Sequence, residues 1–220
     1  MKVMQCWDDG VVEDIRLVDI LRKHQAKATF NLNPGLHDNS KRGNGWMING
    51  VRGARKLALD EMRDVYEGFV IAGHTMTHPD LTKITPERAT AELVDCRRFI
   101  QAFFGQDDCG FAYPGGHYNA SVKGLVRQAG YLYARTVVDV DGELPIHDPM
   151  ELPAHCHFLH PEFWAKYEKV RAIDGVFYFW GHSYEMLSDP AHWDEFEHKM
   201  ARIAADRKAE WIDVRDLFMR

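Results

Sequence analysis

The sequence has few cysteines, no long apolar run and no cluster of basic residues. Its four cysteines, Cys6, Cys96, Cys109 and Cys156, show no C-x-x-C spacing, which predicts buried free thiols in a reducing compartment. No run of 18 apolar residues occurs, so we expect no membrane insertion. The start of the chain lacks a basic region followed by an apolar stretch, unlike a secretory signal. These absences together predict a cytoplasmic protein.

The charge and composition narrow the class of protein further. The formal net charge of -6, without a basic block, argues against a nucleic acid partner. Apolar residues make up 45% of the chain and charged residues 27%, the ordinary balance of a globular protein. A chain of 220 residues is long enough to bury a full core, so we expect one domain over residues 1–220. Nothing in the sequence indicates an oligomeric state.

Apolar runs typical of strands alternate with helical patterns along the whole chain. Strands are predicted over residues 2–7, 28–32, 69–72, 110–113, 132–138, 175–180 and 210–213. Helices are predicted over residues 12–24, 60–66, 85–104, 121–128, 161–170 and 190–207. About seven strand–helix units predict an α/β fold with parallel strands, closed or nearly closed into a barrel. Residues 35–55 are predicted as a long loop that selects the substrate, and residues 139–161 as irregular chain.

Polar and titratable residues gather directly after four of the predicted strands. These groups read D-D-G at residues 8–10, H-T-M-T-H-P at 74–79, Y-P-G-G at 113–116 and G-H-S-Y-E at 181–185. The carboxyl ends of parallel strands meet on one rim, so we expect the four groups to converge there. Each group alone is weak evidence for a site, because the chain has 12 histidines and Asp-Asp-Gly is common in turns. The joint pattern predicts a site.

The residue types in these groups suit hydrolysis at a metal. Two histidines and one carboxylate bind a divalent ion and leave a position open for water, which the ion makes more acidic. A second carboxylate can take the proton of that water, and a histidine can protonate the departing amine. Adjacent Asp8 and Asp9 should push their pKa values apart unless a cation is present. We therefore expect metal removal to raise the apparent pKa of this pair.

The four groups resemble the motifs of the polysaccharide deacetylase family, also called the NodB-homology or carbohydrate esterase family 4 group. The family's T-F-D-D-G is similar to C-W-D-D-G at residues 6–10, and H-[ST]-x-x-H-P matches residues 74–79 in full. The R-x-P-Y motif is similar to A-Y-P-G at residues 112–115, and the final histidine motif matches W-G-H at 180–182. The resemblance implies a distorted (β/α) barrel of about seven parallel strands in a single domain.

The resemblance also implies an activity and roles for individual residues. The activity is that of a metal-dependent deacetylase, which hydrolyses an acetamide on an N-acetylated sugar with a metal-bound water as nucleophile. Asp8 would be the general base, His182 the general acid, and the backbone N–H of Gly115 a donor to the oxyanion. The divalent metal, with zinc as the expected ion, would be bound by Asp9, His74 and His78.

One departure from the family pattern leaves two questions. Many members have an arginine that steadies the catalytic aspartate where this chain has Ala112. The candidates to replace it are three arginines of the predicted loop, Arg42, Arg52 and Arg55. The candidates to orient the proposed acid are three carboxylates, Asp139, Asp141 and Glu185.

Other interpretations stay open. A different carbon–nitrogen hydrolase of this fold would act on a small non-sugar amide, and an inactive relative would only bind carbohydrate or metal. A rival metal cluster consists of His155, Cys156 and His157, with Asp148 and His160 nearby; its alternative is a polar wall of the substrate cleft. Three tryptophans are candidates to stack on sugar rings, namely Trp46, Trp164 and Trp180.

Overall fold

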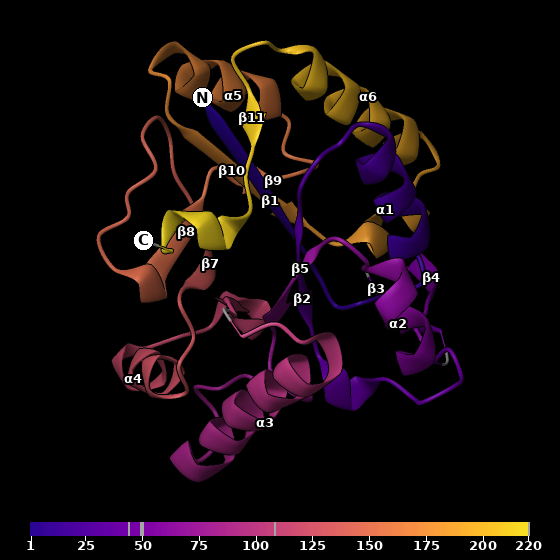
Figure 1. The fold of residues 1–220 in the computed structure, drawn as a ribbon, viewed down its shortest axis with the longest axis vertical. Coiled ribbons are helices and arrows are strands. Elements are labelled where there is room, and N and C mark those ends of the chain that lie inside the picture. Colours follow the sequence, from indigo (N-terminus) through magenta and orange to yellow (C-terminus); the bar gives the residue numbers. More distant parts are fainter. Residues whose placement is uncertain (44, 49–50, 108, 220) are drawn as a thin grey trace.

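A computed structural model describes residues 1–43, 45–48, 51–107 and 109–219 of the chain. Helices surround a central parallel sheet, which confirms the predicted α/β class (Figure 1). The helices are α1 (Asp14–Lys23), α2 (Leu59–Val65), α3 (Pro86–Phe104), α4 (Ala120–Gln128), α5 (Phe163–Ala172) and α6 (Ala191–Ala205). The strands of the main sheet are β1 (Lys2–Asp8), β2 (Thr29–Leu32), β5 (Val70–Gly73), β6 (Phe111–Ala112), β7 (Ala134–Asp139), β8 (Leu152–Ala154), β9 (Cys156–His157), β10 (Val176–Gly181) and β11 (Glu210–Trp211).

The two ends of this sheet meet on one short segment of chain. The strand order is β8-β7-β6-β5-β2-β1-β10-β9, and all these neighbours pair in parallel. Only His155 separates β8 from β9, so residues 152–157 pair with β7 on one side and with β10 on the other. Counted as one strand, this segment closes a distorted ring of seven parallel strands, and the predicted barrel is confirmed.

The prediction that residues 139–161 are irregular is wrong, because β8 and β9 lie inside this range. Both strands are very short, and Pro153 in β8 lacks the N–H that a ladder needs, so the local pattern gave no strand signal. Partners on both sides supply the pairing that local propensity does not.

Alternation along each strand sends one set of side chains into the barrel and the other toward the helices. On β1, Met4 and Cys6 lie in a buried cluster with Tyr178 of β10 and Tyr133, just before β7. Trp7 belongs instead to the larger core between the sheet and the helices, in ring contact with Phe158 and Phe196. The same alternation turns Asp8 inward, as the next residue of the Met4–Cys6 series.

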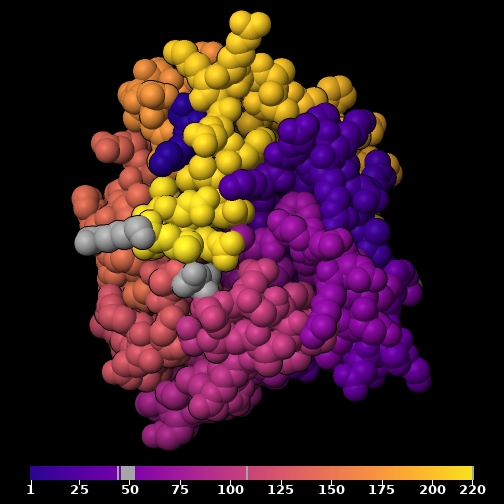
Figure 2. Space-filling model, viewed as in Figure 1, coloured from indigo at the N-terminus to yellow at the C-terminus, as the bar shows by residue number. Residues whose placement is uncertain are grey.

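The C-terminal segment covers the amino ends of the strands. Glu210 N–H donates to the Met1 carbonyl and Ile212 N–H to the Val3 carbonyl, both at 3.0 Å. Phe218 stacks on Tyr133 with ring centroids 5.2 Å apart. Figure 2 shows this segment in yellow, lying across the face turned toward the viewer. With this end covered, the carboxyl ends of the strands are left to form a site.

The prediction of a long loop at residues 35–55 is wrong in part. A short antiparallel hairpin lies within it, formed by β3 (Trp46–Ile48) and β4 (Val51–Ala54). After this hairpin the chain returns to the rim, where Lys56 forms an isolated antiparallel bridge with Val11. The loop therefore delivers a residue to the end of β1.

Two predictions about the whole chain can be compared with the structure. All four cysteines are buried and unpaired, as predicted. Within the described residues, no helix combines the length and apolar character needed to cross a bilayer. The cytoplasmic location stays a prediction.

Candidate active site

Asp8 is the last residue of β1 and lies at the inner rim of the barrel. Its Oδ1 accepts a hydrogen bond of 2.7 Å from Asn31 Nδ2, and Asn31 is its register partner on β2. Its Oδ2 forms an ion pair with the Arg135 guanidinium, which is itself 1% exposed. Burial alone would raise the pKa of Asp8, but the Arg135 charge outweighs burial and holds this pKa below its ordinary value. Asp8 is therefore an oriented, ionised carboxylate.

Asp9, His74 and His78 converge as predicted. Each offers one ligand atom, and these atoms lie within 4.8 Å of one another. His74 Nδ1 donates to the Ala112 carbonyl at 2.7 Å, which leaves Nε2 as the lone-pair nitrogen. Burial lowers the pKa of His74 to about 4, so its imidazole is neutral near pH 7. This donor set and the oriented imidazole fit a divalent metal of the kind that two histidines and a carboxylate bind.

The backbone at these ligands adopts an uncommon conformation. Asp9, Thr75 and His78 have φ angles of 87°, 65° and 59°, in the left-handed region that non-glycine residues rarely occupy. Side chains hold the second segment in place. Thr75 Oγ1 accepts from His78 N–H at 2.9 Å, and Glu92 of α3 accepts from Thr77 N–H at 2.8 Å. The fold thus maintains a strained backbone where the ligands lie.

His182 follows β10 and faces the two aspartates from the opposite side. Its Nε2 lies 3.8 Å from Asp8 Oδ2 and 4.0 Å from Asp9 Oδ2. Its Nδ1 lies 3.4 Å from Glu185 Oε2, an oxygen that also accepts from the His182 backbone N–H at 3.1 Å. Burial would lower the pKa of His182, but Glu185 and Asp8 outweigh burial and raise this pKa above its ordinary value. These two carboxylates therefore favour the protonated form of His182 relative to a free imidazole.

His157 completes this arrangement from β9. Its Nδ1 accepts from Leu159 N–H at 3.3 Å, so the ring proton lies on Nε2 and is donated to Glu185 Oε2 at 2.7 Å. Burial would raise the pKa of Glu185, but its two histidine partners outweigh burial and lower this pKa to about 2. Glu185 is thus an ionised carboxylate between two imidazoles.

One cavity of about 390 Å³ is lined by the charged and imidazole side chains of Asp8, Asp9, His74, His78, Arg135 and His182. Its wall contains the aromatic residues Tyr113, Trp180 and Tyr184 together with Gly115, Gly116 and Val137. Gly115 has a φ of 60°, and among the described residues no group accepts a hydrogen bond from its N–H. A donor of this kind in the wall beside Asp8 is suited to an oxyanion. All six predicted site residues therefore line one cavity.

Comparison with known proteins gives the family. The family model described as polysaccharide deacetylase matches residues 1–134, which is more than half of the chain. The chain belongs to the polysaccharide deacetylase family. The match includes Asp8, Asp9, His74, His78 and Gly115 and ends one residue before Arg135.

Individual relatives and solved structures agree with this membership. The chain is 33% identical over 116 residues to the uncharacterized protein YlxY of Bacillus subtilis, matching 53% of this chain and 30% of YlxY. It spans less than half the length of the curated relatives that it matches. A putative polysaccharide deacetylase from Mycobacterium smegmatis shares the fold, with a TM-score of 0.69, 16% identity and coverage of 99% of this chain and 89% of that one. The Streptococcus pyogenes deacetylase PplD, solved in complex with acetate, has a TM-score of 0.56 and 25% identity over 68% of this chain and 62% of its own.

The missing arginine of this polysaccharide deacetylase family member is supplied by the next strand. Ala112 on β6 is the register partner of Arg135 on β7, so Arg135 lies across the ladder from the position where many members have arginine. Of the three candidates from the predicted loop, Arg42 and Arg55 do not fill this role. Arg42 binds Glu61 at 2.6 Å, Arg55 is exposed, and the side chain of Arg52 lies outside the described residues. Arg135 was missed, although a single charged residue within the apolar stretch L-Y-A-R-T-V-V at 132–138 was a usable signal.

Of the three acidic candidates, Glu185 contacts His182. Asp141 instead binds Lys166 at 3.0 Å, and Asp139 lies 3.9 Å from His160 Nε2. The rival metal cluster does not assemble either. His155 Nδ1 accepts from Tyr178 N–H and Nε2 bonds the Gly142 carbonyl, so neither nitrogen is available to a metal. His157 bonds Glu185, which contacts His182, but neither His155 nor His157 is among the residues that line the cavity, so the alternative of a polar cleft wall stays a prediction.

The three tryptophan candidates differ in their position relative to the cavity. Trp180 lines the cavity, and the Arg135 guanidinium carbon lies 4.8 Å from its ring centroid. Trp164 packs instead under Arg202 of α6, 3.8 Å from the guanidinium carbon. The side chain of Trp46 lies outside the described residues.

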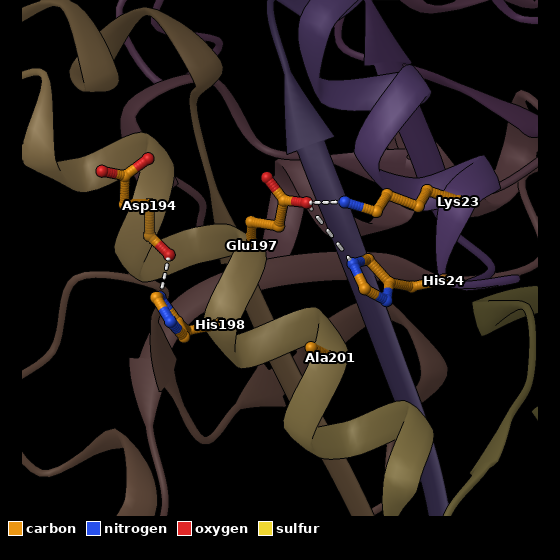
Figure 3. Close-up of a pocket in the computed structure, with 6 residues that line it drawn as sticks. All are labelled: Lys23, His24, Asp194, Glu197, His198 and Ala201. Carbon is orange, nitrogen blue, oxygen red and sulfur yellow. Dashed lines mark hydrogen bonds and ion pairs between the residues drawn. The ribbon is translucent and has the colours of Figure 1, made fainter.

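A second pocket also contains histidines, in the groove between α1 and α6 (Figure 3). Its lysine, its glutamate and its two histidines each have a partner within the pocket. Glu197 binds Lys23 and lies 3.8 Å from His24 Nε2, while His198 Nδ1 bonds the Asp194 carbonyl at 2.7 Å. This pocket is a surface ion-pair cluster, and the six predicted site residues line the rim cavity instead.

Proposed function

We propose that this chain is a metal-dependent deacetylase that hydrolyses the acetamide of an N-acetylated saccharide. The observation that carries the proposal is the convergence of Asp8, Asp9, His74, His78 and His182 on one cavity, with two histidines and a carboxylate on one side and a carboxylate–imidazole pair on the other. Membership of the polysaccharide deacetylase family supports an acetyl group as the target.

The metal, with zinc as the expected ion, would be held by Asp9, His74 and His78. When bound, it supplies a Lewis acid that polarises the acetyl carbonyl and acidifies a water molecule. Asp8 has the role of general base, because it is ionised and fixed on both oxygens by Asn31 and Arg135. It takes the proton of the attacking water.

His182 has the opposite role. Glu185 and Asp8 raise its pKa against the effect of burial, which favours the protonated form, and its Nε2 lies 3.8 Å from Asp8 Oδ2. It donates the proton that the departing amine needs. Glu185 orients the imidazole through Nδ1, and His157 holds Glu185 in turn. The Gly115 N–H donates to the oxygen on which negative charge develops.

The cavity wall supports a sugar as the substrate. Trp180 offers a flat apolar face at the rim, the kind of surface on which the C–H face of a pyranose packs. The relative from Streptococcus pyogenes is a deacetylase solved with acetate, the product that this reaction would release.

The test is release of acetate from N-acetylglucosamine oligomers by the zinc-loaded protein, measured against the same protein treated with a chelator. We expect acetate and a free amine in equal amounts, and loss of both products after chelation. Ammonia or a ring-opened product from a small amide, without acetate from the sugar, would favour a different carbon–nitrogen hydrolase. Sugar binding without any turnover would indicate an inactive relative.

A further inference from the structure

Asp9, the proposed metal ligand, has a buried cation beside it. Lys56 is 8% exposed, and its Nζ lies 3.2 Å from Asp9 Oδ1. The same nitrogen donates to the Asp9 backbone carbonyl and, at 3.1 Å, to Asn33 Oδ1. Three oxygen acceptors are the full complement of an ammonium group, so the geometry is that of a charged lysine. No sequence motif of the site includes Lys56.

The backbone around Lys56 is fixed independently of its side chain. Lys56 forms an antiparallel bridge with Val11, two residues after Asp9. Gly43 N–H donates to the Lys56 carbonyl at 3.0 Å, and Leu57 N–H donates to the Gly10 carbonyl at 3.1 Å. These main-chain hydrogen bonds position Lys56 beside Asp9, and none of them involves the Lys56 ammonium group. A neutral side chain at position 56 should therefore leave the local fold intact.

The charge on Asp9 is thus compensated before any metal binds. Lys56 contacts Oδ1, and Oδ2 is the oxygen that lies near His182 Nε2, at 4.0 Å. A divalent ion held by Asp9 would share one carboxylate with an ammonium group of the same sign. Like charges this close repel strongly where water is largely excluded. Only the metal-bound state contains this repulsion, so it lowers metal affinity.

We propose that Lys56 is a built-in competitor of the metal, which compensates the charge of Asp9 in the metal-free protein and weakens binding of the divalent ion. This inference rests on the metal site of the proposed function. It assigns to Lys56 a role opposite to that of an ordinary supporting residue, whose loss weakens metal binding.

The test compares zinc dissociation constants by competition with a chromophoric chelator at constant pH and ionic strength. We expect Lys56→Met to bind zinc about tenfold more tightly than wild type, from removal of one nearby positive charge. Without metal, the same variant should have a lower Tm than wild type, because Asp9 is left buried without its cation. Saturating zinc should narrow this difference in Tm. The matched control is Lys166→Met, since Lys166 is equally buried but binds Asp141 and lies outside the site cavity.

Lys56→Gln provides a second variant, because it removes the charge but keeps an N–H donor for the Asp9 carbonyl. Tighter binding in both variants supports the proposal. Equal or weaker zinc binding in either folded variant overturns it and makes Lys56 a support for Asp9. If the wild-type protein binds no zinc, the proposed metal site itself is wrong. If it binds zinc but releases no acetate, only the proposed function is contradicted.

Discussion

The two sides of the cavity are built from adjacent aspartates, yet their supports differ. The proposed acid–base side comprises Asp8, Arg135, His182 and Glu185, and its aspartate lies at the end of a regular strand, opposite Asn31 of β2. The proposed metal side comprises Asp9, His74, His78 and Lys56, and two of its three proposed ligands have left-handed backbone conformations beyond the strand ends. The pleat of the sheet thus orients the proton-transfer groups, whereas side-chain hydrogen bonds hold the ligand loop.

Each aspartate also has its own protein cation, Arg135 for Asp8 and Lys56 for Asp9. A cation is therefore present beside each carboxylate without metal, and the expectation that metal removal raises the apparent pKa of the pair stays a prediction. Burial would raise the pKa of Asp9, but Lys56 and the histidines outweigh burial and lower it. Both carboxylates are ionised without metal, so the two sides can be separated by substitution.

The largest expected effect comes from removing the metal side. His74→Ala/His78→Ala should lose bound zinc and all measurable acetate release, because one carboxylate cannot hold the ion alone. The measurement is metal content per chain by elemental analysis. His155→Ala/His157→Ala is the matched control and should keep its metal, since His155 binds only backbone groups. Loss of metal in this control alone would contradict the assignment.

Substitution of the proposed base should strongly reduce catalysis without affecting metal binding. Asp8→Asn should keep bound zinc but lose roughly 10²–10⁴-fold in kcat, the usual worth of a general base. The amide keeps the shape of the side chain and accepts no proton from water. Metal content and kcat measured on the same preparation check the prediction. Full activity in this variant would exclude Asp8 as the base.

The cation of the acid–base side should control the acid limb of the pH profile. Asp8 acts as a base only when ionised, so activity falls as the pH drops through its pKa. Arg135→Gln removes the charge that holds this pKa low, so the acid limb of kcat/KM should move to higher pH, with activity reduced about 10–100-fold near pH 5. Metal content at each pH distinguishes this shift from loss of zinc. An acid limb at the wild-type pH would show that Arg135 does not tune Asp8.

The smallest expected effect concerns the alkaline limb. Glu185 raises the pKa of His182, and the acid must be protonated to act. Glu185→Gln should therefore lower this pKa and move the alkaline limb of kcat to lower pH, with about a tenfold loss above pH 8. His157→Gln, which keeps an N–H donor for Glu185, should leave the limb nearly in place. If Glu185→Gln and His157→Gln have the same pH profile of kcat, the charge of Glu185 does not set the pKa of His182.

The sequence predicted those site residues that are close to one another along the chain or lie at strand ends. Asp8 and Asp9 are adjacent at the end of β1, and His74 and His78 follow β5 four residues apart. The positions of the strand ends therefore predicted that these residues meet. Alternation of strands and helices likewise predicted the parallel barrel.

The supporting residues could not be predicted in the same way. Arg135 is 127 residues from Asp8 and Lys56 is 47 residues from Asp9, so each contact depends on register and loop geometry. Register between β6 and β7 decides that the residue opposite Ala112 is an arginine. No local propensity contains this information, and the same holds for the closure of the barrel by β8 and β9.

The left-handed backbone at Asp9 and His78 also matters for protein engineering. Glycine occupies this conformation without strain, so replacing either ligand by glycine would relax the main chain while deleting a donor to the metal. A library ranked only by thermal resistance would tend to enrich such inactive sequences. Engineering of this protein for thermal stability should therefore keep Asp9 and His78 unchanged and place its substitutions on the outer helices.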